Sequence, residues 1–231
     1  MSDQLKELAA RRAVEYVRPG MVVGLGTGST AGFAIRALGE RAADGLSITC
    51  VSTSNSSHRL GCDVGLTVEP VDDHPAIDLT IDGADEVDGN LDLIKGLGGA
   101  LLREKIVAAA TAEQIIIVDP SKLVQRLGTR GPLPVEVVPF GWPLTRRRLE
   151  KLGAEASLRL LPDSEEPFVT DNGNYILHCT FAGGLEDAPA SERRIDEVPG
   201  VVESGLFIGL TQRVVVGHPG GTCQVLERGG S

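Results

Sequence analysis

One pattern repeats along the first half of the chain: a short apolar run, then a loop of glycines, hydroxyls or acids, then a helical segment. The apolar runs predict strands at residues 21–25, 46–51, 77–81 and 114–118. We interpret these runs as strands that are apolar on both faces. Such strands are typical of parallel sheets, in which helices cover both faces. The alternation therefore predicts an α/β fold with a doubly wound, mostly parallel, Rossmann-like sheet.

The pattern becomes less regular after the proline-rich segment 131–134, which is typical of a domain boundary. The elements expected beyond it are strands at 135–138, 157–161 and 175–180 and helices at 143–152 and 191–198. We interpret this part as a second, smaller α+β domain of ferredoxin-like order. The expected Rossmann-like catalytic domain is 1–131 plus 202–231, and the expected small domain is 132–201, to which we assign oligomer contacts.

Charge and hydropathy exclude two classes of partner. The chain has 32 acidic and 22 basic residues and a net charge of −10, which opposes contact with a nucleic-acid backbone. No apolar run reaches the roughly 18 residues of a membrane span, and the charged, helical N-terminal segment does not resemble a signal peptide. The four cysteines form no C-x-x-C pair, which predicts buried thiols rather than zinc or a disulfide. We therefore expect a cytoplasmic protein without nucleic-acid or membrane partners.

Glycine is enriched, with 29 residues, and three loops hold part of the excess. The first is GLGTGST at 24–30, where glycines permit a sharp turn and backbone N–H groups and hydroxyls can donate to phosphate. A Walker loop is excluded because no Gly-Lys-Ser/Thr occurs. A small phosphorylated ligand is the favoured interpretation, and a structural turn is an alternative. A dinucleotide site is a third, although Ser52 stands near where that motif has an acidic residue.

The second loop, DGADE at 82–86, follows a buried strand at the edge where open parallel sheets bind ligands. Asp82 and Asp85 flank a glycine turn, so their carboxylates can converge to bind sugar hydroxyls or to transfer protons. A capping and turn cluster is an equally weighted alternative. Three acids can also hold a metal, but no histidine lies near them in sequence, and we expect no metal.

The third loop is glycine-rich and runs from Lys95 to Gly99, before a predicted helix. Glu104 falls on the apolar stripe of that helix, with Leu101 and Val107 as neighbours three residues away on either side. A carboxylate on such a stripe is typical of a general base. The alternative is an acid placed early in a helix to complement its dipole.

The segments GLGTGST, IDGADEVDGN and IKGLGGALLREKIVA, in this order and spacing, resemble the ribose-5-phosphate isomerase family of the A type. The similarity extends through VDPSK, GPLPVEV, VTDNGNYIL and PGVVESGLF, and so covers nearly the whole chain. A single glycine motif carries little information, whereas their joint occurrence is specific.

The resemblance assigns site residues position by position. It matches TGST at 27–30, DGAD at 82–85 and the family's KGGG at 95–98, where Leu97 replaces a glycine. Glu104 matches the family's proton acceptor. The implied catalytic and substrate-binding residues are Lys6, Thr27, Gly28, Ser29, Thr30, Asp82, Gly83, Ala84, Asp85, Lys95, Gly96, Leu97, Gly98, Glu104 and Lys122. The β-carbon of Leu97 matters only if that position needs a positive φ or touches the ligand.

The implied activity is interconversion of D-ribose 5-phosphate and D-ribulose 5-phosphate in the non-oxidative pentose phosphate pathway, without metal or cofactor. Glu104 would move a proton between C2 and C1 through an enediolate, while Lys95 and the two aspartates bind O1 and O2. The family's homodimers and homotetramers imply one of these states here. Two alternatives stay open: a non-catalytic sugar-phosphate sensor on the same fold, and a nicotinamide-linked oxidoreductase.

Overall fold

The computed structural model describes residues 3–229, which form two compact units. Unit 1 contains the chain up to Ala84, Arg103–Leu123 and the residues from Gly209 onward. Unit 2 contains Asp85–Leu102 and Val124–Ile208. Each unit has its own sheets and its own apolar core.

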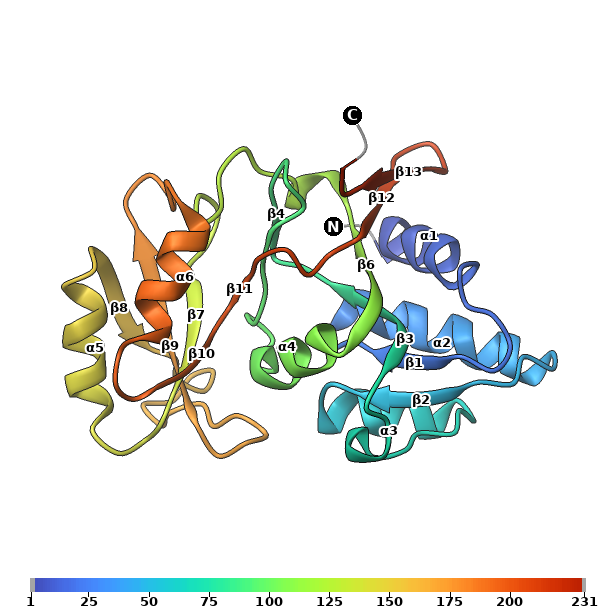
Figure 1. The fold of residues 1–231 in the computed structure, drawn as a ribbon, viewed down its shortest axis with the longest axis horizontal. Coiled ribbons are helices and arrows are strands. Elements are labelled where there is room, and N and C mark those ends of the chain that lie inside the picture. The colour runs from blue at the N-terminus through green and yellow to red at the C-terminus, as the bar shows by residue number, and fades with distance from the viewer. Residues whose placement is uncertain (1–2, 230–231) are drawn as a thin grey trace. The chain divides into compact units, whose positions relative to one another are not determined.

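Unit 1 is built on a six-stranded sheet of order β13-β12-β6-β3-β1-β2 (Figure 1). The strands are β1 (Val22–Leu25), β2 (Thr49–Ser52), β3 (Ile77–Gly83), β6 (Thr111–Val118), β12 (Arg213–His218) and β13 (Thr222–Glu227). All neighbours pair in parallel except β12 and β13, which form an antiparallel hairpin. The mostly parallel sheet is therefore confirmed, and its winding changes direction between β1 and β3.

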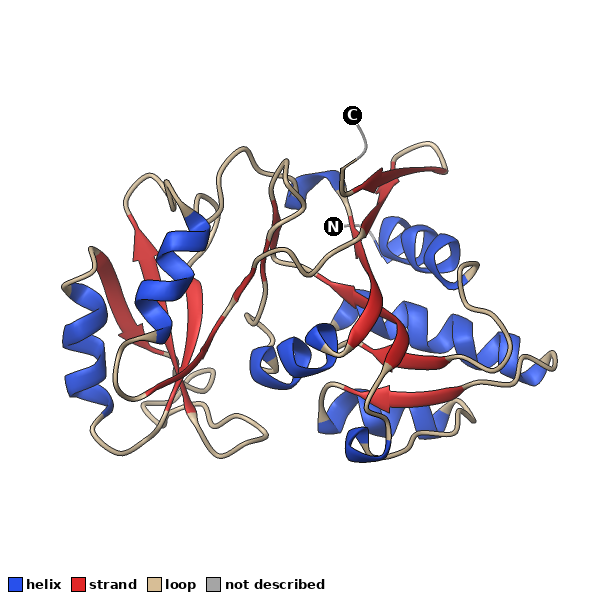
Figure 2. Cartoon of the chain, in the orientation of Figure 1, coloured by secondary structure: helices blue, strands red, loops and turns tan. Residues whose placement is uncertain are grey.

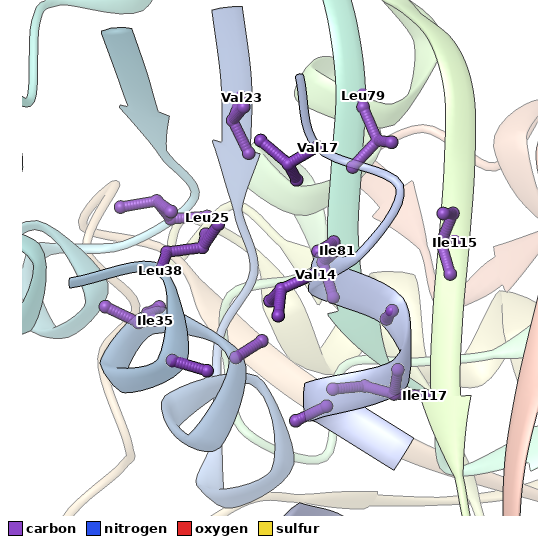
Figure 3. Packing of buried hydrophobic residues seen from close by; sticks show 14 of the residues in the cluster. Val14, Val17, Val23, Leu25, Ile35, Leu38, Leu79, Ile81, Ile115 and Ile117 are labelled. Atoms are coloured by element: carbon purple, nitrogen blue, oxygen red, sulfur yellow. The ribbon is translucent and has the colours of Figure 1, made fainter. Parts of the chain in front are cut away.

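Helices cover both faces of this sheet. They are α1 (Asp3–Val14), α2 (Ser29–Ala43), α3 (Asn55–Asp63) and α4 (Leu101–Ala109), with short 3-10 turns at η1 (Val71–Asp73) and η2 (Pro120–Lys122). Val14 of α1 and Ile35 of α2 pack over Ile81 on one face (Figure 3). On the other face, Val107 of α4 packs with Val51. The predicted doubly wound arrangement is confirmed.

Unit 2 contains a four-stranded antiparallel sheet of order β10-β7-β9-β8. Its elements are β7 (Leu133–Val137), α5 (Trp142–Glu150), β8 (Ala154–Leu158), β9 (Tyr175–Phe181), α6 (Ala188–Asp196) and β10 (Val201–Ser204) (Figure 2). Numbered along the chain, the strands lie in the order 4-1-3-2, which is the ferredoxin-like arrangement predicted from sequence. Leu149 of α5 and Ile195 of α6 share one core with Val135 and Leu177, so both helices cover the same face.

Unit 2 also contains a three-stranded sheet that the sequence did not predict. It joins β4 (Glu86–Val87), β5 (Leu93–Ile94) and β11 (Leu206–Phe207) in the order β11-β5-β4. Segments 85–102, 124–131 and 202–208 consequently belong to unit 2 and not, as expected, to the Rossmann-like domain. Backbone bonds explain the difference, since Lys95 donates to the carbonyl of Gly205 at 2.9 Å. Strands of two residues show no periodicity from which these pairings could be inferred.

Two further expectations concern single helices and residues. Within residues 3–229, no helix has both the length and the apolar character needed to cross a bilayer. All four cysteines are free thiols; Cys50 and Cys179 are buried as predicted, Cys223 is partly buried, and Cys62 is exposed. Burial raises the pKa of Cys50 and of Cys179 to about 12.

Candidate active site

In unit 1, the loop after β1 contacts the end of β3. The two strands are neighbours at the point where winding reverses, which is where open parallel sheets bind ligands. Gly26 donates its N–H to the carbonyl of Ile81 at 3.0 Å, and Thr27 donates its N–H to Oδ1 of Asp82 at 3.1 Å. A β-carbon on Gly26 would lie 2.3 Å from Cγ of Asp82, so only glycine fits. The first and second predicted loops therefore meet in unit 1.

The start of α2 gathers hydrogen-bond donors. Gly28, with a φ of 103°, precedes Ser29, and within the described part of the chain no side chain caps this helix. Such a helix end presents N–H groups to an anion. Lys6 of α1 donates from Nζ to Oγ of Ser29 at 3.0 Å, and Thr30 lies against Gly83. Amides, hydroxyls and an ammonium group are the donors that bind phosphate.

A chain of hydroxyl groups supports this loop from β2. Oγ1 of Thr27 lies 2.7 Å from Oγ1 of Thr53 and 2.8 Å from Oγ of Ser54. Thr53 also donates to the carbonyl of Leu25 at 2.9 Å, and Ser54 caps α3 by accepting from the N–H of Ser57 at 3.0 Å. The conformation of the 27–30 loop is therefore fixed by side chains from the segment that follows β2.

Glu104 lies in the first turn of α4 and is only 5% exposed, as its place on the apolar stripe predicts. The preceding residue, Arg103, donates from Nη1 to Oδ1 of Asn55 at 3.1 Å. Asn55 begins α3 directly after the hydroxyl run. This hydrogen bond connects the start of α4 to the segment that supports Thr27. The buried Glu104 carboxylate belongs to the residue next to Arg103.

Lys122 follows β6, the strand next to β3. It lies in η2, where the buried Asp119 caps the turn by accepting from the N–H of Ser121 at 2.7 Å. The side chain of Lys122 is half-buried. Since β3 and β6 are parallel, the turn that holds Lys122 emerges at the same edge of the sheet as Asp82.

In unit 2, Asp85 and the third loop are joined directly. Oδ2 of Asp85 accepts a hydrogen bond from the N–H of Leu97 at 3.0 Å. Lys95 is 3% exposed, and its Nζ lies 5.5 Å from the centroid of the Phe207 ring. A lysine beside an aromatic face gains a cation–π interaction. A buried ammonium group and a carboxylate are therefore held on the same short loop structure.

The glycine loop accommodates Leu97 without strain. The positions with positive φ are Gly96 (104°) and Gly99 (94°), both still glycine, and Leu97 is not among them. Gly98 has open space around it, and the Leu97 side chain reaches towards Gly131. The departure from the KGGG pattern therefore leaves the backbone of this loop intact.

The structure places every predicted site residue within one unit or the other. Lys6, Thr27–Thr30, Asp82–Ala84, Glu104 and Lys122 belong to unit 1, and Asp85 and Lys95–Gly98 belong to unit 2.

Sequence reasoning missed Thr53, Ser54 and the Asn55–Arg103 pair, although a run of hydroxyls at the end of a parallel strand was the available signal.

Among residues 3–229, no three histidine, cysteine or acidic side chains gather closely enough to hold a metal ion. The buried Glu86 is used structurally instead. It accepts from the backbone N–H groups of Gly128, Arg130 and Gly131 at 2.7, 2.8 and 3.0 Å. The acid at the end of the second predicted loop thus fixes a turn, in keeping with the capping interpretation for that residue.

Comparison with known proteins gives a consistent result. The family model for ribose 5-phosphate isomerase A (phosphoriboisomerase A) matches residues 49–221. The chain is 56% identical to the ribose-5-phosphate isomerase A of Gloeobacter violaceus over 220 residues, covering 95% of this chain and 94% of that protein. It is 50% identical to that of Roseiflexus castenholzii over 228 residues, covering 97% of each.

Solved structures are similarly close. Ribose 5-phosphate isomerase A from Methanocaldococcus jannaschii gives a TM-score of 0.93 at 39% identity, covering 98% of this chain and 100% of that one. A D-ribose-5-phosphate isomerase in complex with phospho-erythronic acid gives a TM-score of 0.94 at 38% identity, covering 97% and 98%.

Proposed function

The chain belongs to the ribose 5-phosphate isomerase A family and is an isomerase, and we propose that it interconverts D-ribose 5-phosphate and D-ribulose 5-phosphate through an enediolate. The observation that carries the mechanism is the burial of the Glu104 carboxylate in the first turn of α4. A carboxylate shielded from bulk water and fixed on a helix is suited to accept a proton from carbon.

The reaction moves two protons and needs no other reactant. Glu104 takes the proton from C2 of the open-chain aldose, the C2–H electron pair forms the C1=C2 bond, and the C1=O π pair moves to O1, which gives the enediolate. The O2 hydroxyl proton then passes to O1, Glu104 returns its proton to C1, and C2 becomes a carbonyl. A single base on one face of the substrate accomplishes both carbon transfers.

Asp82, Asp85 and Lys95 carry the groups that would bind the sugar oxygens O1 and O2. Their carboxylates and ammonium group can bind O1 and O2, pass the hydroxyl proton and offset negative charge on the enediolate. The Asp85–Leu97 hydrogen bond and the Gly26–Asp82 contact fix both aspartates before substrate arrives. Fixed groups need little reorganisation when charge develops, which favours the transition state.

The phosphate end is assigned to the Thr27–Thr30 loop with Lys6 and Lys122. The motif lies at the start of α2, and Lys6 is already bonded to Ser29 there. A chain of net charge −10 must produce positive potential locally, and helix amides with two lysines provide it. Binding of this remote group positions the reacting carbons.

The test is isomerase turnover by the purified chain with EDTA present, starting from either sugar phosphate. We expect turnover in both directions at undiminished rate in EDTA. Binding of ribose 5-phosphate without turnover would instead support a sugar-phosphate sensor. Loss of activity in EDTA would contradict the metal-independent scheme.

A further inference from the structure

The four-stranded sheet of unit 2 has one polar face. Its other face carries Ala156 and Leu158 of β8, which pack into the core with α5 and α6. Alternation along a strand therefore directs Arg159, the next residue, to the side away from the helices. The backbone N–H of Arg159 continues the ladder by donating to Ile176 at 2.9 Å. His178 of β9 lies on the same polar side.

Arg159 is held in a fixed orientation by Phe168. Its guanidinium carbon lies 3.8 Å from the centroid of the Phe168 ring, which is a close stack. The Phe168 N–H also donates to the carbonyl of Arg159 at 2.9 Å. Backbone and side chain thus fix the same pair, so the guanidinium plane has little freedom.

The Arg159–Phe168 pair contacts the end of the glycine loop. A β-carbon on Gly99 would lie 2.5 Å from Cζ of Phe168 and 3.2 Å from Nη1 of Arg159. The Gly99 backbone therefore rests directly on the stacked pair. Because Gly99 has a φ of 94°, neither its conformation nor its surroundings admit another residue.

Arg159 also acts on the other fixed point of this loop, Asp85. Burial lowers the pKa of Arg159, and the nearby Asp85 charge opposes that shift by raising it. The positive charge of Arg159 also affects His178. Burial is the larger cause that lowers the pKa of His178, and the charge of Arg159 is the smaller one. Asp85 in turn holds Leu97 by hydrogen bond. The Arg159 guanidinium thus contacts the loop at Gly99 and interacts electrostatically with Asp85.

We propose that Arg159 is a positioning residue for isomerisation, holding Asp85 and the Lys95–Gly99 loop in the conformation that binds the reacting end of the sugar. This rests on the proposed function, in which Asp85 and Lys95 bind O1 and O2. Arg159 itself need not touch the substrate. Its charge and its flat stack on Phe168 are the two properties that the role requires.

Three variants separate these properties. R159M removes the charge and keeps an apolar side chain beside Phe168, R159K keeps the charge without the planar stack, and F168L removes the stack and keeps the arginine. We expect kcat/KM to fall about 50-fold in R159M and only about fivefold in R159K and F168L, as for loss of a positioning charge against loss of packing. R159Q replaces R159M if that variant does not fold.

The constant for competitive inhibition by inorganic phosphate is a second readout, because a variant that disturbs the whole fold would change this constant as well. Phosphate binding is assigned to unit 1, so its inhibition constant should stay within about twofold of wild type in all variants. Equal losses in R159M and R159K, an unchanged kcat/KM in R159M, or a parallel rise in the phosphate constant would each overturn the positioning role. Absence of turnover in the wild-type chain would instead overturn the proposed function itself, so the two failures are distinguishable.

Discussion

The two units place polar side chains by different means. In unit 1, β1, β2, β3 and β6 are parallel neighbours, so their carboxyl ends share one edge, and polar residues follow each strand there. In unit 2 the strands are antiparallel, so successive ends point in opposite directions and no edge collects them. Polar groups there are gathered on a face of the sheet, as Arg159 is, or by hairpins, as Asp85 is.

This difference decides what a sequence can disclose. A polar group that follows an apolar strand can be placed by counting strands, whereas one on a sheet face requires the strand pairing to be known. It also assigns different tasks to the units. Unit 1 carries the proposed base, the proposed phosphate-binding loop and Asp82, and unit 2 carries the other two proposed oxygen-binding residues, Asp85 and Lys95.

The largest expected effect comes from the unit 1 base. E104Q should lower kcat by about a thousandfold, because an amide cannot accept the carbon proton, and should leave KM within about tenfold. Steady-state kinetics check this, with E155Q on an exposed position of β8 as the matched control of unchanged activity. A Gln variant that retains activity would remove Glu104 from the proton transfer.

The next effect contrasts a glycine from each unit. G26A forces a β-carbon to 2.3 Å from Asp82, and overpacking of this kind should reduce the free energy of unfolding by about 3 kcal/mol. G98A, in open space and without a positive φ, should change it by less than about 1 kcal/mol. Urea unfolding of the two variants measures both. Equal losses would show that the unit 1 loop is not the more constrained of the two.

A smaller effect is expected at the remote end of the substrate. K122A should raise KM about tenfold with little change in kcat, because the lysine is assigned to a group that does not react. K151A, exposed at the end of α5, is the control and should alter neither constant. A collapse of kcat alone in K122A would instead place Lys122 in the chemistry.

The smallest effect compares how readily each unit opens. Cys50 lies in β2 of unit 1 and Cys179 in β9 of unit 2, and both are buried, so native thiol labelling at pH 8 reports local opening. Exposed Cys62 should react first. We expect Cys50 to react about threefold faster than Cys179, because β2 is an edge strand of its sheet whereas β9 lies between β7 and β8. The reverse order would contradict this ranking of the units.

Alkaline pH should act on both units through the same thiols. Their pKa in the folded chain is about 12, above the ordinary value of 9.0, so folding favours the protonated form. The associated stability is fully present below pH 9 and is lost as the pH rises through the range from 9 towards 12. Urea denaturation midpoints at pH 8 and pH 10 measure this loss of stability. The difference between the two midpoints should be smaller in C50A and in C179A than in the wild-type chain.

Much of the fold could be predicted because it follows from periodicity. The strands at 21–25, 77–81 and 114–118 and the ferredoxin-like order all correspond to observed elements. Short strands are predicted at 91–94 and 205–208, where β5 and β11 are found. Their pairing with β4 in a separate sheet could not be predicted, because two-residue strands carry no periodicity that identifies their partners, and this sheet shifts the boundary between the units. The three glycine-containing loops lie between the elements that the sequence predicts. The burial of Glu104 followed from its position on the apolar stripe of α4. The Arg103–Asn55 bond and the Arg159–Phe168 stack depend on tertiary contacts.

The position of β12 has a consequence for how the chain is made. β12 pairs with β6, yet the two strands are separated in sequence by nearly all of unit 2. During synthesis, the β6 edge of the unit 1 sheet stays open until the segment from Gly209 onward has left the ribosome, whereas Val124–Ile208 can already pair its own strands. An unpaired apolar edge is prone to aggregation. A ribosome pause before β12 is therefore expected to expose the Gln114–Val118 edge to chaperones.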